Sequence, residues 1–275
     1  MFVKLEQAEV YTEIIGSGKP LLMIHGNWCD HRLMSGCMER IFTSQGTSGY
    51  AEKFKRIYFD LPGMGDTVLK KDISTTDDIV DIVDAFISET IQEETFYIAS
   101  ESYGSYIAQA IVKKYQDRIG GIMMLCPVTV PLPEERELPF RNVIYRDNYF
   151  YNQLSSNDQD TCDNMLTIQS RENWERYINE VRCGVRKADI SLLKKIKRYG
   201  YPLRENADVP DTPFGKPALI ITGRQDTAVG YRDALVLTEN YPSSDFVILD
   251  RAGHMLQIEQ EKIFETLVLN WLSKL

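Results

Sequence analysis

The chain has 275 residues, of which 43% are hydrophobic and 26% charged, and its formal net charge is −9. This is the composition of a globular protein with a sizeable core, and it excludes a disordered or collagen-like chain. So acidic a chain is a poor match for nucleic acid, because affinity for phosphates comes mainly from lysine and arginine. The longest uncharged run is shorter than the roughly 20 apolar residues of a membrane-spanning helix.

The cysteines and the first residues indicate where the protein works. The five cysteines are odd in number, and no two have C-x-x-C spacing, so we expect reduced thiols and no zinc site. The opening residues contain no apolar segment typical of a signal peptide. We therefore expect a cytoplasmic protein without a membrane span, a metal or a nucleic-acid partner; its oligomeric state is left open.

Strand and helix signals alternate along most of the chain. The predicted strands are residues 8–15, 20–25, 54–59, 95–99, 119–126, 217–222 and 245–249. The predicted helices are residues 31–43, 77–91, 103–115, 172–183, 188–198, 231–240 and 255–272. Alternating strands and helices indicate an α/β fold, with a parallel sheet covered by helices on both faces. Between residues 128 and 216 no buried strand is visible, so we interpret this stretch as a helical insertion.

A serine stands at the turn between the strand 95–99 and the helix 103–115. The local sequence Ser100-Glu101-Ser102-Tyr103-Gly104 is similar to a nucleophile elbow, G-x-S-x-G, with serine replacing the first glycine. The residues two before and two after the nucleophile must be small, because the turn brings them against neighbouring backbone. Ser102 is thus a candidate nucleophile, although a serine that only caps the helix is an equally good reading of these five residues.

An acid and an imidazole follow two later strands. Asp226 comes just after the strand 217–222, and His254 just after the strand 245–249. In a parallel sheet such positions lie at one edge, where ligands bind. A serine needs a base to accept its proton, and the base needs a carboxylate to orient it. We therefore predict His254 as the base and Asp226 as the acid, in preference to Asp233 and Asp250.

The loop after the strand 20–25 supplies a candidate oxyanion hole. It reads His25-Gly26-Asn27-Trp28, and we predict that the backbone N–H groups of Asn27 and Tyr103 stabilise an oxyanion. Trp28 is a predicted pocket residue. In the insertion, Tyr145 and Tyr149 belong to an aromatic-rich segment that either lines an apolar pocket or packs the insertion onto the core.

Taken together, these motifs resemble the α/β-hydrolase superfamily, in its form with a core and a helical cap. The resemblance rests on the four segments above and on Asp60-Leu61-Pro62-Gly63-Met64-Gly65, all at predicted strand ends. It implies an eight-stranded, mostly parallel sheet flanked by helices, with a core of residues 1–127 and 213–275 and an α-helical cap of residues 128–212.

The resemblance implies a serine hydrolase that cleaves an ester, thioester, lactone or related small acyl compound without a metal or cofactor. Two alternatives stay open at this stage. The same triad could cleave an amide or a carbon–carbon bond, or the fold could bind a small molecule with little turnover. Haloalkane dehalogenases share the His-Gly-Asn loop, but Ser102 stands where they need an aspartate.

Overall fold

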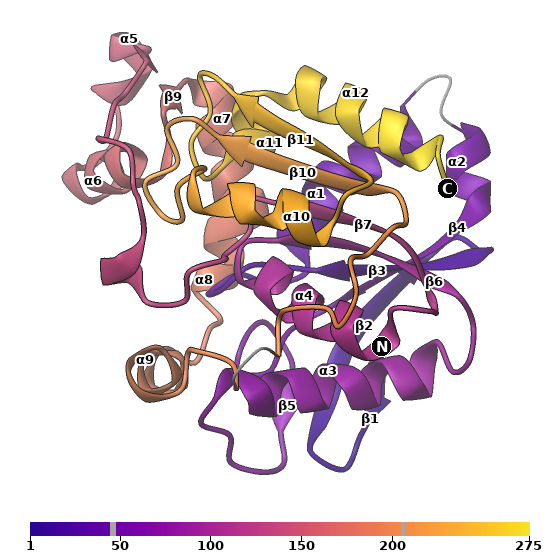
Figure 1. The fold of residues 1–275 in the computed structure, drawn as a ribbon. Coiled ribbons are helices and arrows are strands. Elements are labelled where there is room, and N and C mark those ends of the chain that lie inside the picture. The colour runs from indigo at the N-terminus through magenta and orange to yellow at the C-terminus, as the bar shows by residue number, and fades with distance from the viewer. Residues whose placement is uncertain (45–47, 205–206) are drawn as a thin grey trace.

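The computed structural model describes residues 1–44, 48–204 and 207–275. Within these residues the main sheet has nine strands, eight of them in the order β1-β2-β4-β3-β6-β7-β10-β11, with β5 paired to β2 (Figure 1). The strands are β1 (Phe2–Lys4), β2 (Ala8–Ile15), β3 (Lys19–Ile24), β4 (Phe54–Phe59), β5 (Val68–Leu69), β6 (Phe96–Glu101), β7 (Ile119–Leu125), β10 (Ala218–Gly223) and β11 (Ser244–Leu249). The two-residue strand β5 is the addition to the expected eight.

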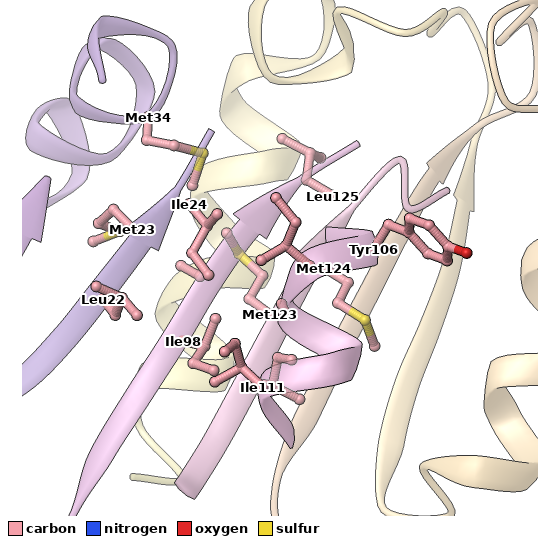
Figure 2. Close-up of a cluster of buried hydrophobic side chains, with 14 of the residues drawn as sticks. Leu22, Met23, Ile24, Met34, Ile98, Tyr106, Ile111, Met123, Met124 and Leu125 are labelled. Carbon is pink, nitrogen blue, oxygen red and sulfur yellow. The ribbon is translucent and has the colours of Figure 1, made fainter. Parts of the chain in front are cut away.

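The strand directions agree with a mostly parallel sheet. From β4 to β11 every neighbouring pair is parallel, whereas β2 is antiparallel to β1, β4 and β5. The sequence of β3 is almost wholly apolar because both faces of this central strand are covered. Figure 2 shows side chains of β3, β6 and β7 packed with Met34 and Ile111 from the covering helices, and all those it labels are at most 2% exposed.

Helices cover both faces of the sheet. On one face α1 contacts α12, and on the other α3 contacts α4 (Figure 1). The core helices are α1 (Arg32–Thr43), α2 (Ser48–Lys53), α3 (Thr76–Thr90), α4 (Tyr103–Tyr115), α10 (Leu237–Asn240), α11 (Leu256–Glu259) and α12 (Glu261–Leu272), with a short turn η3 (Asp233–Val236). The predicted helix 255–272 is therefore broken at Gln260, and the predicted helix 231–240 is short and irregular.

The insertion lies between β7 and β10 and is mainly helical. It contains η1 (Pro133–Glu135), β8 (Tyr145–Arg146), α5 (Asn148–Tyr151), α6 (Ser156–Met165), β9 (Ile168–Gln169), α7 (Arg171–Arg176), η2 (Tyr177–Arg182), α8 (Cys183–Val185) and α9 (Ile190–Tyr199). Most of these elements lie on the side toward which the carboxyl ends of β10 and β11 point (Figure 1). Trp174, Tyr177 and Val181 form a small apolar cluster with Met255 and Ile258 of the core, which fixes the insertion beside the site.

No helix in the described residues is both long enough and apolar enough to cross a membrane.

Candidate active site

The serine of the elbow has a backbone conformation that side chains rarely adopt. Ser102 follows β6 directly and has a φ of 52°. Its neighbours explain why the turn can be so tight. A Cβ at Gly104 would overlap the carbonyl oxygens of Ile24 and His25, so glycine is required there. Ser100 is wholly buried, and its Oγ lies 3.0 Å from the carbonyl oxygen of Met123. A small side chain fits this position, as the sequence predicts.

The structure brings Ser102, His254 and Asp226 together. His254 Nε2 lies 3.0 Å from Ser102 Oγ, and His254 Nδ1 lies 2.8 Å from Asp226 Oδ2. Both distances are those of hydrogen bonds. The contacts join residues 152 and 28 positions apart, because β6, β7, β10 and β11 are successive neighbours in the sheet. The serine hydroxyl, imidazole and carboxylate thus form one continuous chain.

The loop after β10 holds the carboxylate of Asp226 in its charged form. Asp226 Oδ1 accepts hydrogen bonds from the N–H groups of Ala228 (2.8 Å) and Val229 (3.1 Å). Burial opposes ionisation, but the His254 imidazole and these two N–H groups lower the pKa of Asp226 below its ordinary value. The other carboxylate oxygen remains directed at His254.

Opposing effects act on the pKa of the His254 imidazole. Burial favours its neutral form, but Asp226, with a smaller effect from Glu101, outweighs burial and raises the pKa of His254 above its ordinary value. Protonation of Nε2 is therefore favourable, which is what a base that receives the serine proton requires.

The two N–H groups of the predicted oxyanion hole are free to bind an acceptor. Within the described residues, the N–H groups of Asn27 and Tyr103 donate to no internal acceptor. The loop carrying Asn27 is fixed by the buried His25, whose Nδ1 lies 2.8 Å from the carbonyl oxygen of Gly26 and whose Nε2 accepts the N–H of Leu61 at 2.9 Å. Tyr103 begins α4, so its N–H points out of the positive end of a helix.

A cavity of about 360 Å³ opens onto these groups. It is lined by Asn27, Trp28, Glu101, Ser102 and His254 from the core, and by apolar and aromatic side chains of the insertion. The insertion contributes eight apolar or aromatic residues and two cationic ones: Val128, Pro131, Pro133, Met165, Tyr177, Val181, Val185 and Tyr201, with Arg136 and Lys197. Trp28 is therefore placed in the cavity wall.

The two tyrosines predicted in the pocket require a correction. Tyr145 is 47% exposed, Tyr149 is 80% exposed, and neither lines the cavity. The reason is local. In the segment from β8 to α5, Phe150 is the side chain that turns inward, at 3% exposure, so its neighbour Tyr149 points to solvent.

The sequence analysis missed Glu101, Arg136 and Tyr201. Glu101 could have been found from its place beside Ser102. The other two lie in an insertion whose orientation the sequence does not define. Arg136 donates to the carbonyl oxygens of Val130 and Ala228 at 2.8 Å, and to that of Pro131 at 3.1 Å. It thereby connects the entry of the insertion to the loop that carries Asp226.

In the part of the chain that the structure describes, two groups of side chains have the composition of a metal site. They are Cys126, Asp226 and His254, and Asp30, His31 and Asp60. In each group the histidine is already hydrogen-bonded to an aspartate, with His31 Nδ1 2.7 Å from Asp60 Oδ1. Burial raises the pKa of Cys126 well above its ordinary value, which disfavours the thiolate that metals bind. Neither arrangement points to a metal.

Comparison with known proteins agrees with the fold. The family model for the alpha/beta hydrolase fold matches residues 19–261. The chain therefore belongs to the alpha/beta hydrolase fold family. A solved alpha/beta superfamily hydrolase from Oenococcus oeni is 26% identical to this chain, with a TM-score of 0.84. The match covers 100% of this chain and 98% of the Oenococcus chain.

Curated relatives are named for different reactions. A 2-hydroxy-6-oxononadienedioate/2-hydroxy-6-oxononatrienedioate hydrolase of Burkholderia vietnamiensis is 24% identical over 80% of this chain and 77% of its own length. A pimeloyl-[acyl-carrier protein] methyl ester esterase of Aeromonas hydrophila is 23% identical over 89% of this chain and 92% of its own. The chain is thus a hydrolase of the alpha/beta family, and its relatives leave the substrate class open.

Proposed function

We propose that the protein is a serine hydrolase that cleaves an ester, thioester, lactone or related small acyl compound. The observation that carries this proposal is the continuous hydrogen-bonded chain Ser102–His254–Asp226, with distances of 3.0 and 2.8 Å. Ser102 lines a cavity of about 360 Å³, which is within the size range of small-molecule sites. We propose Asn27 and Tyr103 as the oxyanion hole and Trp28 as a substrate contact.

The proposed reaction has two stages. Ser102 Oγ attacks the carbonyl carbon of the substrate, its proton moves to His254 Nε2, and the N–H groups of Asn27 and Tyr103 stabilise the oxyanion. The carbonyl–leaving-group bond then breaks, and Nε2 returns the proton to the leaving group. In the second stage water attacks the acyl-enzyme, loses a proton to Nε2 and releases the acid, and Ser102 is reprotonated. No metal or organic cofactor takes part in this scheme.

We further propose that residues 128–212 form a cap that selects the substrate, over a core of residues 1–127 and 213–275. Nineteen of the described residues line the cavity, and ten of them, from Val128 to Tyr201, belong to this segment. Most of them are apolar or aromatic, which favours an uncharged acyl chain over a peptide or polymer. A small cytoplasmic metabolite is the substrate that we infer.

The relative from Burkholderia supports a second candidate, hydrolysis of a carbon–carbon bond beside a ketone. The same three side chains could serve that reaction, because a carbonyl carbon is again the centre attacked. An amide substrate is a further variant. A binding protein with little turnover is less well supported, because the hydrogen-bonded chain is complete.

Labelling with a fluorophosphonate probe tests the proposal, because the probe reacts with an activated serine. We expect one adduct, on Ser102, and hydrolysis of p-nitrophenyl acetate that Ser102→Ala abolishes. Ser88→Ala, which changes an exposed serine on α3, is the matched control and should leave both intact. An unlabelled Ser102, or undiminished hydrolysis by Ser102→Ala, would rule the proposal out. A panel that adds amides and 2-hydroxy-6-oxo-dienoates separates the bond types.

A further inference from the structure

A second carboxylate lies beside the imidazole of His254, and the triad does not use it. Glu101 is the last residue of β6, directly before Ser102. Its side chain is only 2% exposed, and Oε1 lies 3.3 Å from His254 Nε2. This is the same nitrogen that lies 3.0 Å from Ser102 Oγ. The imidazole is therefore placed between two carboxylates, with Asp226 at Nδ1 and Glu101 at Nε2.

The fold makes room for Glu101 at this position. A Cβ at Gly26 would overlap the carboxylate, so the absence of a side chain at residue 26 is what admits it. Within the described residues, this carboxylate makes no other hydrogen bond or ion pair. A buried carboxylate is costly unless a positive charge or a donor compensates it, and the imidazole of His254 is the group in reach.

Six other charged or titratable groups face Glu101 or His254. They are Asp226, Cys29, Cys37, Cys126, Tyr201 and Arg136. Burial raises the pKa of the three thiols and of Tyr201, so all four are neutral at pH 7. Arg136 acts against a positive imidazole, but its guanidinium donates to backbone carbonyls. Burial raises the pKa of Glu101 itself to about 7; the His254 imidazole acts against this increase and Asp226 adds to it. Above pH 7 Glu101 is therefore mainly charged, and two carboxylates face one imidazole.

We propose that Glu101 is a second charged partner of the base: it faces Nε2 and stabilises the imidazolium that His254 becomes when it accepts the Ser102 proton. The inference rests on the proposed serine-hydrolase function. In each stage the proton stays on Nε2 until the leaving group or Ser102 takes it, and Glu101 accepts a hydrogen bond from Nε2–H without taking the proton. Glu101 thereby increases kcat/KM at high pH. It also raises the pH below which His254 is protonated before the reaction and cannot act as the base.

The test is the pH dependence of kcat/KM with p-nitrophenyl acetate for wild type, Glu101→Gln and Glu101→Asp. Removing the Glu101 charge this close to the imidazole should lower the pKa of His254 by about one unit or more. The acidic limb of the kcat/KM profile of Glu101→Gln should therefore shift to lower pH by that amount. Its plateau should fall about tenfold. Glu101→Asp keeps the charge, and its limb should lie nearer that of wild type. Asp250→Asn, which changes an exposed carboxylate four residues before His254 in the chain, is the control and should not shift the limb.

A second measurement does not need turnover. In the Ser102→Ala protein, the imidazole signal of His254 can be titrated by NMR, because the chain has only three histidines. We expect a pKa above the ordinary value of about 6.5, and a value at least about one unit lower when Glu101→Gln is added. This result stands even if the acetate ester is not a substrate, whereas an unlabelled Ser102 would count against the function itself.

Three outcomes would overturn the inference. The acidic limbs of Glu101→Gln and wild type could coincide. The variant could change only KM for cationic substrates, which would make Glu101 a substrate contact. If Glu101→Gln does not fold, Glu101→Ala takes its place in the titration of the Ser102→Ala protein, and a His254 pKa that this change leaves unaltered would refute the proposal.

Discussion

The carboxylate of Glu259 accepts a hydrogen bond of 2.6 Å from the N–H of Gly253, the residue directly before His254. The same carboxylate accepts the N–H of Ile168 at 2.9 Å and that of Thr167, both in the insertion. Burial raises the pKa of Glu259 to about 7, although these three N–H groups act in the opposite direction. One buried side chain therefore joins the insertion to the loop of the base.

This relationship predicts that Glu259 supports both stability and catalysis. Glu259→Ala leaves three backbone donors without their acceptor, two of them buried, and should lower the free energy of unfolding by about 3 kcal/mol. It should also reduce kcat about tenfold, because the loop of His254 loses its anchor. Glu259→Gln, which keeps one acceptor oxygen, should lie in between. Denaturant unfolding and ester hydrolysis measure the two effects, with Glu265→Gln on α12 as the control. A fully stable and active Glu259→Ala protein would contradict the prediction.

The carboxylate of Asp226 should control both the rate and the pH profile. Asp226→Asn places an amide where the imidazole Nδ1–H needs an acceptor, so kcat should fall by about 10³-fold. Because Asp226 raises the pKa of His254, its loss should also move the acidic limb of kcat/KM to lower pH. The remaining activity is measured from pH 5 to 9. An unchanged limb in the Asp226→Asn enzyme would show that the carboxylate does not act on the imidazole.

Gly104 should tolerate no side chain. The Cβ of Gly104→Ala would overlap the carbonyl oxygens of Ile24 and His25, and this overpacking should cost about 1–3 kcal/mol of stability. Fluorophosphonate labelling of Ser102 should slow in parallel, since the elbow must shift. At Gly215 no described atom lies within 4 Å of an added Cβ, so Gly215→Ala is the matched control with stability close to wild type. Equal stability of the two variants would refute the packing argument.

Trp28 and Tyr149 should differ in their effect on substrate binding. Trp28 lines the cavity, so Trp28→Ala removes apolar contact area and should raise KM several-fold. Tyr149 is 80% exposed and lies outside the cavity, so Tyr149→Ala should leave KM within about twofold of wild type. Steady-state kinetics with p-nitrophenyl butyrate compares the two variants. A larger effect at Tyr149 would mean that the insertion changes position when substrate binds.

The size of the cavity predicts a limit on acyl chain length. At about 360 Å³ it suits short acyl groups, so p-nitrophenyl acetate and butyrate should be hydrolysed faster than the decanoate. Met165→Trp narrows the wall contributed by the insertion and should reduce hydrolysis of the hexanoate about tenfold, with a smaller effect on the acetate. If all chain lengths lose activity equally, the side chain at residue 165 affects the reacting groups instead.

The sequence alone determined where the strands lie along the chain. It also determined which three polar residues meet at the edge of the sheet formed by the carboxyl ends of these strands. Ser102, Asp226 and His254 follow strands that are parallel, and the carboxyl ends of parallel strands must share one edge. The sequence also predicted that small residues are needed at Ser100 and Gly104. The tightness of a strand–turn–helix elbow depends on neighbouring residues and little on the rest of the chain.

Only the tertiary structure decided what surrounds those residues. Glu101 lies beside His254 because Gly26, far away in the chain, leaves space for its carboxylate. Tyr149 points to solvent while Tyr177 and Tyr201 line the cavity, a choice fixed by how the insertion packs on the core. Strand periodicity constrains one edge of a sheet, whereas the placement of an inserted helical segment depends on long-range packing that no local pattern encodes.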